Sequence, residues 1–148
     1  MFRYIENQDR TFLFGAYRGE KSQLEWILGK QPHRYEKLYN IRFNKDLFSQ
    51  RRGGVISEQL PDYVLIYNTQ NPQDGYHLFP CISSSIKEQS DMEALGYPNP
   101  DGSYVVYSLG DELLSEPLDI RKLMLKALPN ENVNVPFSPA ILKGKDIA

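Results

Sequence analysis

Alternating apolar and polar positions predict a series of short strands separated by polar turns. Segments with this pattern, or with a short apolar run between turn residues, are 2–5, 11–18, 33–43, 62–68, 76–82 and 103–109. In segment 33–43, one strand face is predicted to hold Tyr35, Tyr39, Ile41 and Phe43. Ten tyrosines and seven phenylalanines suit pleated, half-buried surfaces, so strand is expected to outweigh helix.

The stretch SQLEWILGK carries the first helix signal. Ser22 is the candidate N-cap, and Glu25 stands three residues later, which is the spacing of a capping box. Gly29 adopts a left-handed backbone readily, so the helix is expected to end there.

Two further helices are predicted, at 86–95 and 118–128. Gly96 is expected to end the first of them, and the serines at 83–85 are expected to cap its start. Pro129 would stop the second, and the tail beyond it is expected to wrap the surface.

The order of these elements predicts an α+β fold with a mostly antiparallel mixed sheet and two or three short helices packed against it. Strands and helices do not alternate as they do in parallel βαβ folds. A chain of 148 residues lies within the size of one domain, so residues 1–148 are interpreted as a single domain.

The cysteine content favours a reducing, cytoplasmic location. Cys81 is the one cysteine, so no disulfide forms within the chain. The first residues do not resemble a signal peptide, and no apolar run reaches the length of a membrane span, so no membrane partner is expected.

Charge is distributed unevenly along the chain. Segment 30–52 has seven basic and two acidic side chains, a net charge of +5. Segment 53–119 has eleven acidic side chains and Lys87, a net charge of −10. These two segments are named the basic segment and the acidic segment below. The small overall charge of −2 therefore results from two consecutive segments with strong and opposite net charges.

The basic segment is interleaved with aromatic residues, a combination typical of single-stranded nucleic-acid sites. Guanidinium groups bind phosphate in a bidentate manner, aromatic rings stack on bases, and glycines let backbone N–H groups approach an anion. The predicted phosphate ligands are Arg34, Arg42, Arg51 and Arg52, the stacking residues are Tyr39 and Phe48, and the backbone contacts are Gly53 and Gly54. The sequence thus favours a small binding module for nucleic acid or another phosphate-bearing ligand.

Two alternatives remain open for the same charge pattern. The first is protein–protein contact or self-association, in which the basic segment of one copy faces the acidic segment of another. The pattern is equally compatible with closure onto the acidic segment of the same molecule.

Several catalytic patterns are missing, so the sequence leans away from an enzyme. His33, His77 and Cys81 are not spaced as metal ligands, and no metal or cofactor is predicted. Asp62 starts a strand after Pro61, as in a PD-(D/E)xK nuclease, but the second half of that motif is missing. Asp62 is therefore interpreted as a turn residue, and the chain has neither a Walker loop nor a GxGxxG motif.

Two short stretches resemble the GNAT acetyltransferases. The run QRRGG resembles part of their acyl-CoA loop, and MEALGYPNPDGSYVVYSL resembles the helix, turn and strand near the end of that fold. The resemblance implies a pyrophosphate held by backbone N–H groups. This chain departs from the family pattern because Val55 stands at the last Gly/Ala position and Pro61 ends the helix that should follow. After protein–protein interaction or self-association, a GNAT-like acyltransferase with a degenerate acyl-CoA loop is the second alternative to the function of a phosphate-binding module.

Overall fold

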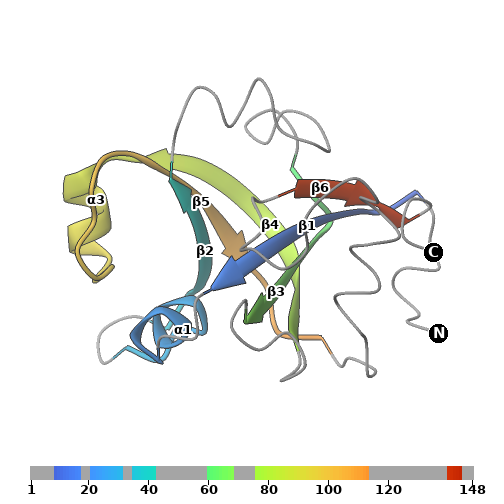
Figure 1. Cartoon of the computed structure of the whole chain (residues 1–148), viewed down its shortest axis with the longest axis horizontal. Coiled ribbons are helices and arrows are strands. Elements are labelled where there is room, and N and C mark those ends of the chain that lie inside the picture. The colour runs from blue at the N-terminus through green and yellow to red at the C-terminus, as the bar shows by residue number, and fades with distance from the viewer. Residues whose placement is uncertain are drawn as a thin grey trace.

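The computed structural model describes residues 9–17, 21–31, 35–42, 60–68, 76–113 and 140–144. The elements along the chain are β1 (Thr11–Tyr17), α1 (Lys21–Ile27), β2 (Lys37–Arg42), β3 (Tyr63–Asn68), β4 (Tyr76–Lys87), α3 (Gln89–Ala94), β5 (Tyr104–Leu109) and β6 (Ala140–Lys143) (Figure 1). The predicted strand at 2–5 and the predicted helix at 118–128 lie outside the described residues.

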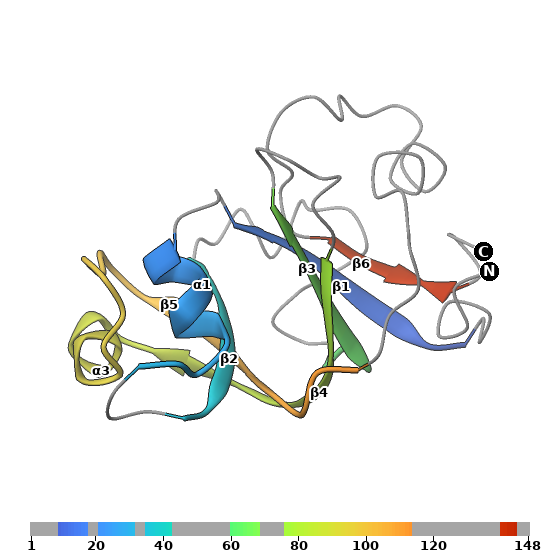
Figure 2. The same cartoon turned by 90° about the horizontal axis from the view of Figure 1, so that it is seen from below.

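The strands form one mixed sheet in the order β2-β5-β4-β3-β1-β6. Neighbouring strands are antiparallel except β1 and β3, which run parallel. Helices α1 and α3 are short and lie at the same end of the molecule as β2 (Figures 1 and 2). This arrangement confirms the predicted α+β fold with a mostly antiparallel sheet.

The long strand β4 joins the two parts of the sheet. Tyr76–Pro80 pairs with β3, and Cys81–Lys87 pairs with β5, with a register shift between Cys81 and Ser83. Such a bulge bends a strand and increases its twist, which turns the β5–β2 part away from the β3–β1 part (Figure 2).

The serines at 83–85 are strand residues, and their predicted role as helix caps was wrong. Each has a ladder partner in β5: Ser83 faces Ser108, and Ser84 faces Tyr107. The cap of α3 is instead Glu88, whose backbone N–H donates to the Asp91 carboxylate at 3.0 Å.

Glycine ends both helices as predicted. The φ angles of Gly29 and Gly96 are 68° and 78°, in the left-handed region that favours glycine. Helix α1 begins at Lys21, however, so Ser22 lies in its first turn rather than at the N-cap.

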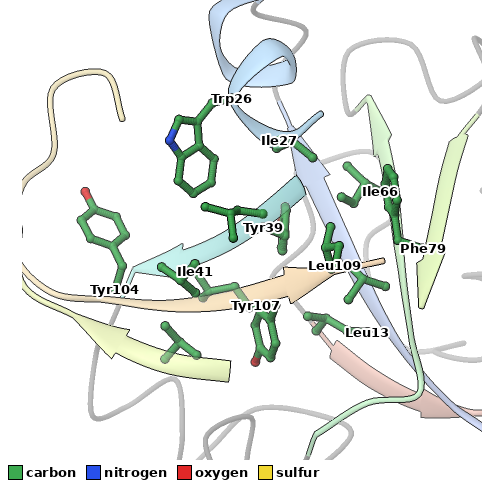
Figure 3. Close-up of a cluster of buried hydrophobic side chains, with 14 of the residues drawn as sticks. Leu13, Trp26, Ile27, Tyr39, Ile41, Ile66, Phe79, Tyr104, Tyr107 and Leu109 are labelled. Atoms are coloured by element: carbon green, nitrogen blue, oxygen red, sulfur yellow. The ribbon is translucent and has the colours of Figure 1, made fainter. Parts of the chain in front are cut away.

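Aromatic and aliphatic side chains from both helices and from β1 to β5 form the core (Figure 3). Trp26 of α1 is fully buried, and its indole N–H donates to the Leu95 carbonyl at 3.3 Å. Tyr97 meets the indole edge-on with ring centroids 5.0 Å apart. The indole therefore holds α1 against the end of α3.

Strand β6 pairs antiparallel with β1 and is an edge of the sheet. The sequence predicted only that the tail wraps the surface. A four-residue strand between Pro139 and Gly144 carries too little alternation to be found from sequence.

Candidate nucleic-acid interface

The structure describes part of the basic segment. Lys30, Gln31 and residues 35–42 are described, and Arg42 is the last residue of β2, opposite Tyr104. The other predicted ligands, Arg34, Phe48, Arg51, Arg52, Gly53 and Gly54, lie outside the described residues.

Tyr39 lies in the core, which corrects its predicted role as a stacking residue. It is 4% exposed, and its neighbours Leu38 and Ile41 in β2 are buried as well. The ring packs over Gly15 of β1, where an added Cβ would lie 2.4 Å from Tyr39 Cζ. A ring packed in this way has no free face for a base.

Tyr35 has the opposite environment from the one predicted. Its side chain is 81% exposed, whereas the alternation over 33–43 placed it inward with Tyr39. The reason is that β2 begins only at Lys37, so the two-residue period of a strand does not extend back to Tyr35. The exposed aromatic ring of this part of the basic segment is therefore that of Tyr35, four residues before the buried Tyr39.

The backbone beneath Tyr35 is fixed against the end of α1. A Cβ added at Gly29 would lie 2.4 Å from the Tyr35 carbonyl oxygen and 2.6 Å from that of Glu36. Only glycine permits this approach at a φ of 68°. Gly29 thus holds the chain in place while the Tyr35 side chain points to solvent.

Lys30 follows α1 directly and is exposed. Its ammonium makes no ion pair with any side chain in the described part of the protein. Gln31 next to it donates from its side-chain amide to the Gly96 carbonyl at 2.9 Å. Lys30 thus lies between two residues with fixed contacts, Gly29 and Gln31, and its ammonium pairs with no side chain among the described residues.

Lys37 is differently placed, because it meets the acidic segment. Its Nζ lies 3.5 Å from Oδ1 of Asp111, and strand β2 pairs with β5, which is part of that segment. One cation of the basic segment thus faces an acid of the same molecule. This contact supports closure within one chain at this position.

Asp62 lies in a bend just before β3, in agreement with its interpretation as a turn residue. Its carboxylate accepts hydrogen bonds from the Thr11 N–H at 2.9 Å, the Thr11 hydroxyl at 3.2 Å and Arg10 Nη1 at 3.3 Å. The Asp62 N–H donates back to the Thr11 hydroxyl at 3.0 Å. These bonds join the starts of the parallel strands β1 and β3.

Burial raises the pKa values of three titratable groups of the sheet. Burial raises the pKa of the Cys81 thiol to about 11, so the thiol is protonated at neutral pH. Burial also raises the pKa values of the Tyr67 and Tyr107 phenols far above the usual range. His77 in β4 is partly exposed and contacts the Glu112 carboxylate through Nδ1.

Within the described residues, no three His, Cys, Asp or Glu side chains gather as metal ligands. Over the same residues, no helix is both long and apolar enough to cross a bilayer.

The comparison with known proteins identifies a similar fold and does not assign an activity. No protein-family model matches the chain, and neither does any curated protein. A crystal structure of a ZmASCH mutant protein from Zymomonas mobilis is similar over 94% of this chain and 93% of that one, with a TM-score of 0.53 and 12% identity. A second ZmASCH mutant protein gives 9% identity over 91% and 92% of the two chains, with a TM-score of 0.49. At such identities the likeness shows a shared fold alone.

Proposed function

We propose that this protein is a cytoplasmic binding module that engages single-stranded nucleic acid through the basic segment, residues 30–52. The observation that carries the proposal is the exposed Tyr35 ring, whose backbone packs against Gly29, the residue before the exposed Lys30. Another ligand with several phosphates would use the same contacts.

The proposed site assigns stacking to Tyr35. An aromatic side chain that stacks on a base contributes about 1–3 kcal/mol, whatever the base. Because the Tyr35 backbone packs closely against Gly29, little backbone entropy is lost at Tyr35 when a base binds. The exposed ring thus replaces the buried Tyr39 in the predicted site.

Phosphate binding is assigned to cations of the same basic segment. Lys30 provides a point charge, and Arg34 precedes Tyr35 directly in the sequence. Arg51 and Arg52, with Gly53 and Gly54 behind them, complete the proposed site on sequence grounds. Lys37 is left out because its ammonium lies 3.5 Å from the Asp111 carboxylate.

Binding to such a site has a characteristic salt dependence. Four phosphate contacts on a single strand release enough counterions to give a slope of log affinity against log salt of about −3. The overall charge of −2 does not attract a polyanion, so the favourable charge is that of the basic segment alone.

The test is fluorescence anisotropy with labelled single-stranded and double-stranded oligonucleotides over a salt series. We expect tighter binding to single strands, because only unpaired bases offer a free face to Tyr35, and a steep loss of affinity as salt rises. The double variant Arg51→Ala, Arg52→Ala should weaken binding strongly. The matched control Arg121→Ala, Lys122→Ala changes the net charge equally and should bind as the wild type does. Equal losses in both variants, or salt-independent binding, would contradict the proposal.

The acyltransferase alternative has one structural observation in its favour. Helix α3, the left-handed Gly96 and strand β5 form the helix, turn and strand that the GNAT resemblance implies for this stretch. A thermal-shift measurement with acetyl-CoA separates the two functions, because a ligand that binds only the folded protein raises Tm. We expect no shift with acetyl-CoA and a shift with single-stranded oligonucleotide.

A further inference from the structure

Two neighbouring acids that follow β5, Asp111 and Glu112, contact basic side chains of different strands. Asp111 Oδ1 lies 3.5 Å from the ammonium of Lys37, the first residue of β2. The Glu112 carboxylate contacts Nδ1 of His77 in β4. Strand β5 lies between β2 and β4 in the sheet order, so one acid of the pair reaches the basic segment and the other does not.

The backbone on both sides of this acid pair is fixed against β4. The Gly110 N–H donates to the Pro80 carbonyl at 2.8 Å, and the Leu113 N–H donates to another β4 carbonyl at the same distance. Gly110 also packs on the Pro80 ring, where an added Cβ would lie 2.7 Å from Cγ. Asp111 is therefore held beside Lys37 by its backbone.

The contact between Lys37 and Asp111 is an ion pair in contact with water. The Asp111 side chain is fully exposed, and that of Lys37 is 30% exposed. Within the described residues, Asp111 is the acid that pairs with Lys37. Exposed ion pairs are weak, because water solvates both charges. Another anion can therefore compete with the Asp111 carboxylate for this ammonium.

Lys37 also stands close in the chain to the ring to which stacking is assigned. It follows the exposed Tyr35 by two residues, and two residues of extended chain span at most about 7 Å. A nucleotide stacked on Tyr35 carries its phosphate on the same side of the base as its sugar, within the length of a lysine side chain from this part of the backbone.

We propose that Lys37 is a further phosphate ligand of the nucleic-acid site and that Asp111 occupies its ammonium in the free protein. The inference rests on the proposed function, because the competing anion is the phosphate backbone of the same single strand. Lys37 binds phosphate only when its pair with Asp111 is open. Asp111 therefore lowers the affinity of the site for nucleic acid without contacting the ligand.

Fluorescence anisotropy with a labelled oligothymidylate at low salt tests this competition. Asp111→Asn removes the competing charge and keeps the side-chain shape, so it should bind about two- to fivefold more tightly than the wild type. Its salt slope should become steeper by at most about 0.7, the contribution of one more phosphate contact. The matched control Glu112→Gln removes one negative charge at the next position and should gain much less. Circular dichroism checks that each variant is folded.

A double-variant cycle assigns the gain to Lys37. In a Lys37→Gln background, Asp111→Asn should change the affinity no more than Glu112→Gln does. Equal gains from Asp111→Asn and Glu112→Gln, or a gain that persists without Lys37, would reflect net charge and overturn the inference. Wild-type binding that depends on Tyr35 and is unchanged by Asp111→Asn would overturn this inference alone. Absence of binding by every protein, the wild type included, would overturn the proposed function as well.

Discussion

The phenol ring of Tyr39 packs over Gly15, leaving no room for a side chain at that glycine. Tyr39 belongs to β2 and Gly15 to β1, and three strands stand between β2 and β1 in the sheet order. The contact therefore requires a strongly curved sheet whose distant strands face each other across the core (Figure 3). The same contact commits Tyr39 to packing, whereas Tyr35, also in the described part of the basic segment, is exposed to ligands.

Gly15→Ala should destabilise the protein. The added Cβ would lie 2.4 Å from Tyr39 Cζ and 2.6 Å from the Tyr39 hydroxyl oxygen, so the ring or the strand must move. Overpacking of a dense core costs about 1–3 kcal/mol, and urea denaturation should show a loss of this size.

A second substitution tests the mechanism of that loss. Tyr39→Leu removes the ring, so the double variant with Gly15→Ala should lose much less stability than the two single losses combined. Strict additivity of the two losses would show that the methyl group does not meet the ring.

Asp62→Ala should destabilise the protein by about 1–2 kcal/mol, because it leaves the Thr11 N–H and hydroxyl without their acceptor. The matched control is Asp111→Ala, which removes an exposed ion pair with Lys37 and should leave the urea midpoint almost unchanged. Similar midpoints for the two variants would contradict the structural role of Asp62.

The Cys81 thiol should react slowly at neutral pH. Burial raises its pKa to about 11, and the thiolate is the reactive form, so alkylation should accelerate tenfold per pH unit up to that value. Protein unfolded in urea is the control and should react as an ordinary thiol with a pKa of about 8.5. A folded-state rate that levels off near pH 9 would contradict the effect of burial.

Local sequence patterns correctly predicted the elements that depend little on contacts between distant residues. The apolar runs of β1, β3 and β5 and the glycines that end α1 and α3 are visible in the sequence. The serines at 83–85 misled the prediction because serine favours caps, while their strand conformation depends on pairing with β5.

The site was harder to predict because it depends on where a strand begins. Tyr35 and Tyr39 share a face only if the strand includes both, and β2 starts at Lys37. The curvature that buries Tyr39 over Gly15 arises from contacts between residues far apart in the sequence, which no local pattern contains.

The most direct measurement is the affinity of Tyr35 variants for a labelled single-stranded oligonucleotide at fixed low salt. Tyr35→Ala removes the exposed ring and should weaken binding by about 5- to 150-fold, the equivalent of 1–3 kcal/mol of stacking. Tyr35→Phe keeps the ring and should bind within about twofold of the wild type. Because the side chain is 81% exposed, both variants should unfold at the wild-type urea midpoint. Unchanged affinity in Tyr35→Ala, or no binding by the wild type, would contradict the account.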